Sequence, residues 1–223
     1  MMNKRKKVFI ACDTTNIKKI KEIINKTQTS KLKIGYKFGL EFLNSKNGRK
    51  FVSQLKNQIT FGDYKYSDIP NTCSSAIKVI KDLKFDYCTV HISSGLEALK
   101  AVKKVSGKTK IVGVSILTSL DNKALKEIGF NKDVKKIVHL QAKLASKAKL
   151  DAVVCSAEEV KIVKKVFKKE IITPGVQVGK RNYDQKRSME AKKVKSDWLV
   201  IGRAITARGN IKRNIQNLAK ELR

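Results

Sequence analysis

The sequence predicts an α/β protein that folds as a single-domain (β/α)8 TIM barrel, and three observations support this. Short apolar runs recur at nearly even spacing along the 223 residues, lysine-rich amphipathic stretches separate them, and polar residues stand where the runs end. Strands that alternate with helices form parallel sheets, and eight such units can close a barrel. A doubly wound open sheet is the alternative, but no G-x-G-x-x-G follows the first run to favour a dinucleotide site.

Each of the eight apolar runs is short enough to be a buried strand: residues 8–12, 32–35, 59–62, 87–91, 111–117, 152–155, 171–173 and 198–201. The stretches between them have helical spacing. Residues 17–25 carry isoleucine at four positions on one helical face, and we expect further helices at 74–83, 134–148 and 158–167. No Gly/Ser-rich or Pro-rich linker divides the chain, so residues 1–223 form one domain, with residues 1–7 as a basic N-terminal tail.

The composition narrows the classes of function. The formal net charge is +31, but the lysines are spread along the chain and the few aromatic residues are not interleaved with them, so we expect no dedicated nucleic-acid partner. A positive field does favour an anionic substrate. No apolar run approaches the ~20 residues of a membrane helix. Four scattered cysteines and only two histidines indicate free thiols in a reducing cytoplasm and no metal site.

Polar residues stand at or just after the C-terminal ends of the predicted strands, where barrel enzymes hold their active sites. They are Asp13, Lys33, Asp63, Lys65, His91, Thr118, Ser156 and Arg203. Residues 175–188 form a polar loop, long for a barrel, which suggests a lid.

Asp63 and Lys65 are two residues apart, so on a strand both side chains point to the same face. A lysine beside a carboxylate can act as a proton donor whose charge is held by its neighbour. A salt bridge at the strand end is the alternative interpretation. For His91 we expect a structural hydrogen bond.

The run D-Y-K-Y-S-D-I-P-N-T at residues 63–72 resembles the D-x-K-x-x-D-I-P/G-N-T motif of the orotidine 5′-monophosphate decarboxylase family. Other resemblances follow in the family's order: I-A-C-D at 10–13, K-I-G at 33–35, T-V-H at 89–91, L-T-S at 117–119, V-C-S-A at 154–157, T-P-G-V-Q at 173–177 and I-G-R-A-I-T at 201–206. No single short match is specific, whereas the ordered set is.

The resemblance implies the TIM barrel and the decarboxylation of orotidine 5′-monophosphate to UMP and CO2 in pyrimidine biosynthesis, with no cofactor. It implies that an alternating array of Lys33, Asp63, Lys65 and Asp68 performs the chemistry. Lys37 is the alternative to Lys33, because it also lies in a family-like K-x-G-x-E run and has the same strand parity. We prefer Lys33 because K-I-G ends the apolar run.

The resemblance also implies the substrate contacts. Asp13 would bind a ribose hydroxyl, and Thr118 the pyrimidine, with Ser119 as the alternative. The phosphate would lie after the last two strands, on Gly202, Arg203 and the lid residue Gln185. Gln177 stands where many bacterial members carry arginine, so one charged contact is missing, and Gln177 would contact the pyrimidine or the lid instead.

Asp68, Ile69 and Thr72 are implied to reach into the site of a neighbouring subunit, which predicts a homodimer with composite sites. Thr72 is alternatively the N-cap of the helix that begins near Ser74. The rival activity on the same scaffold is a sugar-phosphate decarboxylase or aldolase. Those relatives prefer metal-binding acids on the second and fourth strands, and Lys33 and the D-I-P-N-T run at residues 68–72 argue against them.

Overall fold

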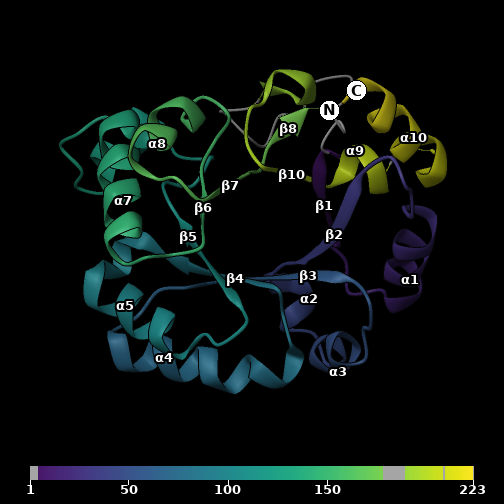
Figure 1. The fold of residues 1–223 in the computed structure, drawn as a ribbon, viewed down its shortest axis with the longest axis horizontal. Coiled ribbons are helices and arrows are strands. Elements are labelled where there is room, and N and C mark those ends of the chain that lie inside the picture. Colours follow the sequence, from purple (N-terminus) through teal and green to yellow (C-terminus); the bar gives the residue numbers. More distant parts are fainter. Residues whose placement is uncertain (1–4, 178–188, 208, 223) are drawn as a thin grey trace.

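A computed structural model of the protein describes residues 5–177, 189–207 and 209–222. Eight parallel strands form a closed barrel in the order β1-β10-β7-β6-β5-β4-β3-β2, and β1 closes the ring by pairing with both β2 and β10 (Figure 1). The barrel strands are β1 (Lys7–Ala11), β2 (Lys33–Phe38), β3 (Ile59–Tyr66), β4 (Tyr87–His91), β5 (Lys110–Val114), β6 (Ala152–Val154), β7 (Glu170–Thr173) and β10 (Trp198–Ile201). The predicted TIM barrel is therefore confirmed.

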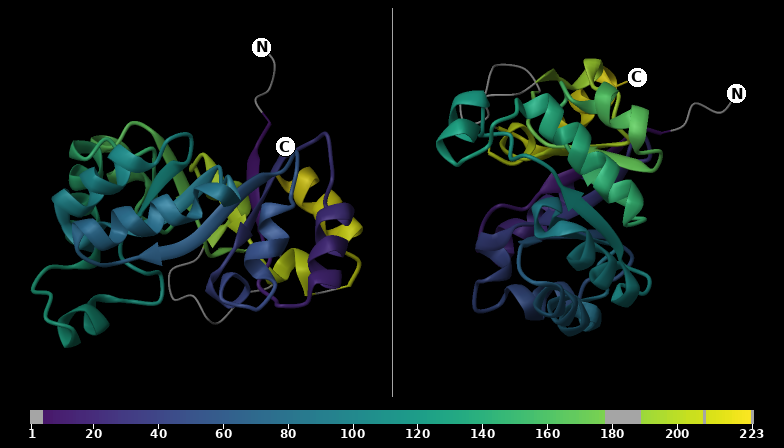
Figure 2. Two further views of the ribbon diagram at one scale, coloured as in Figure 1. Left: turned by 90° about the horizontal axis from the view of Figure 1, so that it is seen from below. Right: turned by 90° about the vertical axis from the view of Figure 1, so that its left-hand side faces the viewer.

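Helices cover the outside of the ring (Figures 1 and 2). They are α1 (Ile17–Lys26), α2 (Leu40–Leu43), α3 (Gly48–Ser53), α4 (Pro70–Val79), α5 (Gly95–Val105), α6 (Asn122–Glu127), α7 (Val134–Lys147), α8 (Val160–Val166), α9 (Arg203–Thr206) and α10 (Ile211–Glu221), with short 3-10 turns η1 (Ile80–Leu83), η2 (Ile92–Ser94) and η3 (Ala191–Lys193). Asn16 and Asp133 cap α1 and α7 by accepting the backbone N–H of the third helical residue. None of the described helices is both long and apolar enough to cross a membrane.

A second, two-stranded sheet is formed by residues between β7 and β10. In it, β8 (Val176–Gln177) pairs in parallel with β9 (Met189–Glu190). Residues 178–188 between these strands lie outside the described residues, so the predicted lid at 175–188 is described only at its beginning.

Aromatic side chains fill the inside of the barrel. Phe9 stacks on Trp198 with ring centroids 4.0 Å apart, and Phe61 and Tyr87 pack around Phe9. Gly35 makes room for this group, because a Cβ there would lie 2.6 Å from the ring of Phe9. Since side chains alternate across a strand, the next inward positions toward the C-terminal end lie above this apolar layer.

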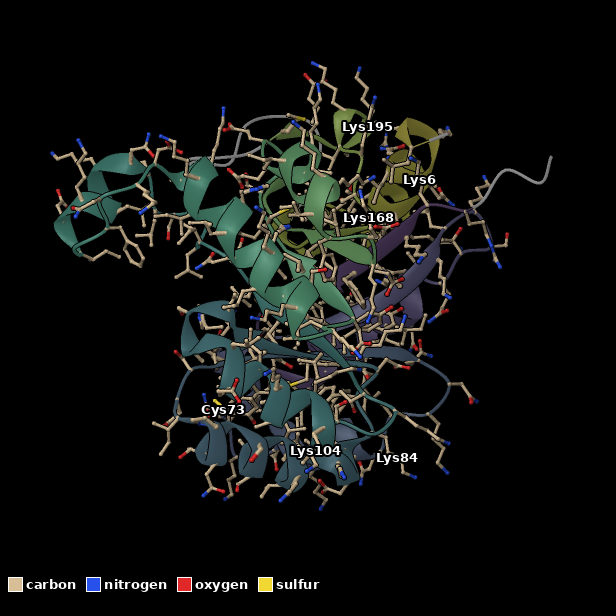
Figure 3. All side chains as sticks on the ribbon, turned by 60° about the vertical axis from the view of Figure 1, so that its left-hand side comes forward. Lys6, Cys73, Lys84, Lys104, Lys168 and Lys195 are labelled. Carbon is tan, nitrogen blue, oxygen red and sulfur yellow. The ribbon has the colours of Figure 1, made fainter. Side chains whose placement is uncertain are left out.

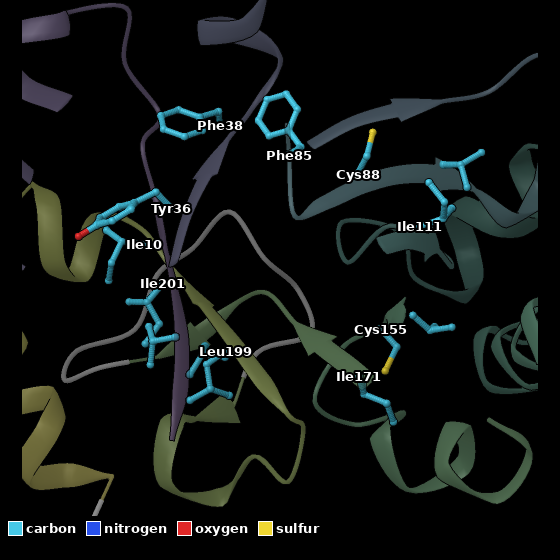
Figure 4. Close-up of a cluster of buried hydrophobic side chains, with 14 of the residues drawn as sticks. Ile10, Tyr36, Phe38, Phe85, Cys88, Ile111, Cys155, Ile171, Leu199 and Ile201 are labelled. Atoms are coloured by element: carbon cyan, nitrogen blue, oxygen red, sulfur yellow. The ribbon is translucent and has the colours of Figure 1, made fainter. Parts of the chain in front are cut away.

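The outward-facing strand residues pack against the helices and form the larger core (Figure 4). The labelled side chains in that view are Ile10, Tyr36, Phe38, Phe85, Cys88, Ile111, Cys155, Ile171, Leu199 and Ile201, which lie on strands or directly beside them. All four cysteines are buried and free.

One carboxylate ties the N-terminal end of the barrel together. Glu170 accepts from Lys7 at 2.7 Å, Lys110 at 2.8 Å, the Tyr87 hydroxyl at 2.9 Å and the Trp198 indole at 3.3 Å. Burial raises the pKa of Glu170, but hydrogen bonds from Lys110, Lys7 and Tyr87 outweigh it and lower the pKa to about 2. The predicted basic tail therefore ends before Lys7, the first residue of β1.

The positive charge is distributed over the molecule. Figure 3 shows Lys84 and Lys104 on one side of the barrel and Lys168 and Lys195 on another. These four lysines therefore lie on more than one side of the described structure, in agreement with the spread of lysines along the sequence.

Candidate active site

A cavity of about 320 Å³ opens at the C-terminal end of the barrel. Its apolar wall consists of inward side chains such as Phe61, Val114 and Val200, and its rim carries the charged groups. The full lining is Ala11, Asp13, Lys37, Phe61, Asp63, Lys65, Val114, Ile116, Leu117, Thr118, Val154, Pro174, Gly175, Val176, Val200, Gly202 and Arg203. A mainly apolar pocket with a few charged side chains at this end of the barrel is typical of barrel enzymes.

Four charges of alternating sign line one side of the cavity. Asp13 Oδ1 lies 3.2 Å from Lys37 Nζ, Lys37 Nζ lies 3.4 Å from Asp63 Oδ2, and Asp63 Oδ2 lies 2.8 Å from Lys65 Nζ. Asp13 follows β1, Lys37 lies on β2, and Asp63 and Lys65 lie on β3, so three neighbouring strands supply the row. We call these four residues the charged row.

Asp63 is buried and still ionised. Burial would raise the pKa of its carboxyl, but Lys37, Lys65 and the Thr89 hydroxyl together hold the pKa below its usual value. The same balance acts on Lys37: burial would lower the pKa of its ammonium, and the carboxylates of Asp63 and Asp13 raise it above the usual value. Each charge in the row therefore depends on its neighbours.

The backbone of β3 is irregular at this point. Gly62 pairs with Cys88 and Tyr66 pairs with Val90, so four steps along β3 match two along β4. Lys65 has a φ of 52°, in the left-handed region that residues other than glycine rarely adopt. The simple strand alternation expected from the sequence is thus replaced by a bulge, yet Asp63 and Lys65 still meet, at 2.8 Å.

The prediction that Lys33 belongs to the array is wrong. Lys33 is the exposed first residue of β2 and pairs with Lys7 at the N-terminal end of the barrel. Lys37, the alternative, lies four residues further along the same strand, roughly 13 Å away at the strand rise per residue. The strand continues through Tyr36 and Phe38 beyond the apolar run at 32–35, and this extension carries Lys37 to the cavity.

The sequence model of the orotidine 5′-phosphate decarboxylase / HUMPS family matches residues 6–218. The chain belongs to this family. It is 38% identical over 227 residues to the orotidine 5′-phosphate decarboxylase of Wolbachia sp. subsp. Brugia malayi (strain TRS), covering 96% of this chain and 98% of that one. The enzyme of that name from Aquifex aeolicus (strain VF5) is 40% identical over 189 residues, or 80% of each chain. The crystal structure of orotidine 5′-phosphate decarboxylase from Lactobacillus acidophilus matches with a TM-score of 0.81 at 26% identity, covering 97% of this chain and 99% of that chain.

Among the residues that the family resemblance singled out, Asp13, Asp63, Lys65, Thr118, Gly202 and Arg203 all line the cavity. Thr118 is half-buried, whereas its alternative Ser119 is exposed and does not line the cavity. Arg203 is the exposed first residue of α9, and Gly202 precedes it. Gln177 lies in β8, where only its backbone is described, and Gln185 lies outside the described residues.

The second half of the motif at residues 63–72 lies outside the cavity of the single chain. Asp68, Ile69 and Thr72 are exposed and do not line it, and Ile69 leaves 65% of its surface exposed. Asp68 accepts the backbone N–H of Ile69 at 2.7 Å. Ile69 is the N-cap residue of α4 and Pro70 its first residue, so the alternative interpretation of Thr72 as that N-cap is wrong.

Sequence reasoning missed one buried polar residue beside the charged row. Thr89 lies in β4, between Tyr87 and His91, and its hydroxyl contacts both Asp63 and Lys65. The signal was a hydroxyl in an apolar run at the same strand parity as the inward-facing Tyr87. His91 is half-buried, and burial together with Lys65 lowers the pKa of its imidazole.

Proposed function

We propose that the protein decarboxylates orotidine 5′-monophosphate to UMP and CO2 in pyrimidine biosynthesis, using its own charged side chains. The observation that carries the proposal is the charged row at the mouth of the cavity, with Lys65 Nζ 2.8 Å from Asp63. Membership of the family over residues 6–218 and the curated relatives at 38% and 40% identity support the same activity.

The difficult step is the cleavage of the bond between C6 of the pyrimidine and its carboxylate. The electron pair remains on C6 when CO2 leaves, so a fixed positive charge beside C6 lowers the barrier. Lys65 supplies that charge, and one of its N–H protons then moves to C6 to give UMP. Asp63 holds the ammonium in place, and Lys37 holds Asp63 from the other side.

The remaining parts of the substrate match the rest of the cavity. The phosphate would bind at Gly202 and Arg203, because barrels bind phosphate at the loops after their last two strands and a guanidinium forms two parallel hydrogen bonds. Thr118 would contact the pyrimidine. The carboxylate of Asp13 has an exposed side, and we assign it to a ribose hydroxyl.

We also propose a homodimer in which Asp68, Ile69 and Thr72 complete the partner's site. Their exposure in the single chain, and above all that of the apolar Ile69, supports this assignment. The four free, buried cysteines support a cytoplasmic location, where thiols remain reduced.

The activity is tested by incubating the protein with orotidine 5′-monophosphate in EDTA, following ultraviolet absorbance and identifying UMP by chromatography. We expect wild-type turnover and a loss of roughly 100-fold or more in kcat for Lys65→Ala. Lys104→Ala, which removes an exposed lysine on α5, is the matched control and should retain wild-type turnover.

Turnover of a sugar phosphate in place of orotidine 5′-monophosphate would support the sister activity and overturn the proposal. The donor set speaks against that outcome, since β2 brings Lys37 and β4 ends in His91 where those relatives prefer acids.

A further inference from the structure

We infer that Thr89 is a positioning residue for this decarboxylation: its single hydroxyl fixes the Asp63 carboxylate and the backbone of Lys65 together. The inference rests on the proposed function for the reaction that Thr89 serves.

The first contact is with the backbone. Lys65 N–H donates to Thr89 Oγ1 at 2.7 Å. Because the register shifts between Gly62 and Tyr66, the bulge takes the Lys65 N–H out of the regular ladder between β3 and β4. The left-handed conformation of Lys65, at φ 52°, costs energy in a residue with a Cβ, so it persists only where its surroundings hold it.

The second contact is with the side chain. A hydroxyl has one hydrogen, and since Thr89 Oγ1 accepts from Lys65 N–H, its hydrogen is available to Asp63 Oδ1, 3.1 Å away. The other carboxylate oxygen, Asp63 Oδ2, then faces Lys65 Nζ at 2.8 Å and Lys37 Nζ at 3.4 Å. The two oxygens of Asp63 therefore have separate tasks, and the hydroxyl sets which oxygen faces the ammonium groups.

The third point is burial. Thr89 is fully buried, so water cannot easily replace its hydroxyl when it is removed. Without the hydroxyl, the Lys65 N–H and Asp63 Oδ1 would both lack a partner that they have now. The bulge and the carboxylate would relax together, and displacements on the order of 1 Å are enough to slow a positioned reaction about 100-fold.

The test compares three substitutions. Thr89→Val removes the hydroxyl and keeps the shape, and Thr89→Ser keeps the hydroxyl and loses one methyl group. Thr60→Val is the matched control. Thr60, on β3, is a buried threonine like Thr89, and its hydroxyl lies 3.4 Å from the carboxylate of Asp86, but it does not line the cavity.

We expect Thr89→Val to lower kcat by roughly 10- to 100-fold while KM changes little, since the phosphate and ribose contacts lie elsewhere. Thr89→Ser should recover most of the kcat, and Thr60→Val should keep it.

Hydrogen exchange of the Lys65 amide supplies a readout that does not need turnover. The Lys65 amide should exchange faster in Thr89→Val than in the wild type and in Thr60→Val. Wild-type kcat in Thr89→Val, or an unchanged Lys65 exchange rate, would overturn the inference. If Thr89→Val does not fold, the ratio of Thr89→Ser to Thr89→Ala isolates the same hydroxyl, and equal kcat in these two would also overturn it. If the wild type itself does not turn over orotidine 5′-monophosphate, the proposed function has failed, and the exchange rates still decide whether Thr89 holds Lys65.

Discussion

Lys37 and Lys33 provide an internal comparison, because they lie on the same strand with the same parity but at opposite ends of the barrel. We expect Lys37→Ala to remove two ion pairs, with Asp13 at 3.2 Å and with Asp63 at 3.4 Å. Lys33→Ala removes an exposed side chain far from the cavity. Substitutions of that kind usually change stability by at most about 0.5 kcal/mol.

The distances give the size of the effect. With an effective dielectric constant of about 20, two unit charges 3.4 Å apart attract each other by about 5 kcal/mol. If half of that attraction serves the transition state, its loss slows kcat roughly 70-fold. Stability should also fall, because removing one partner of a buried pair leaves Asp63 with less compensation, at a typical cost of about 3 kcal/mol.

The measurements are kcat and KM with orotidine 5′-monophosphate and the free energy of unfolding in urea, for both variants beside the wild type. Lys37→Ala should be slow and destabilised, and Lys33→Ala should match the wild type in both. A Lys33→Ala variant that is slower than Lys37→Ala would refute the assignment of the array to the charged row.

Three further outcomes are expected. Arg203→Ala should lower kcat/KM, and an unchanged kcat/KM would mean that phosphate binds elsewhere. In the wild-type protein, free phosphite should partly restore turnover of a substrate that lacks the phosphate, because remote binding energy can drive loop closure. If Asp68 serves the partner's site, co-refolding Lys65→Ala with Asp68→Ala should restore roughly a quarter of wild-type activity, since half the dimers are mixed and each has one intact site; no recovery despite mixed dimers in native mass spectra would place Asp68 in its own subunit's site. The difference in Tm between wild type and Asp63→Asn should stay constant from roughly pH 5 to pH 9.

The pH expectation follows from the directions of two shifts. The pKa of Asp63 lies below its ordinary 3.8, so its ionised form stabilises the fold above that pH, and this contribution is lost as pH falls through the lowered pKa. The pKa of Lys37 lies above its ordinary 10.5, so its contribution is present below that pH and is lost as pH rises through the raised pKa. A Tm difference that already declines near neutral pH would show that the row does not hold both charges.

Much of the fold could be predicted because each barrel strand is a short apolar run bounded by polar residues. The ends of the runs also predicted that Asp13, Asp63 and the residues after β10 belong to the site, since the C-terminal ends of the strands meet at one rim of the barrel. Lys33 and Lys37 could not be separated in this way. Alternation assigns both to the same face, and the strand passes beyond its most apolar part before it ends at Phe38.

The bulge in β3 could not be predicted from the hydrophobic pattern either. The sequence D-Y-K contains no glycine that would indicate a positive φ. The left-handed conformation of Lys65 depends on the Thr89 hydroxyl of the neighbouring strand. A contact between residues so far apart in the chain cannot be derived from local propensity. Thr89 was missed for the same reason, because a threonine within a strand is ordinary until its partner is known.

The closure of the ring through β1 and β10 has a consequence for how the chain reaches this structure. Lys7 pairs with Trp198, so the first strand made has no partner on one side until almost the whole chain has been synthesised. Until then β1 and β7 are open edges that could pair with another molecule, and such non-local pairings form slowly. Glu170 joins side chains from β1, β4, β5 and β10, so it can contribute fully only in the last step. A truncation that ends before Trp198 would leave both edges exposed, and we expect such a chain to aggregate rather than fold as a smaller barrel.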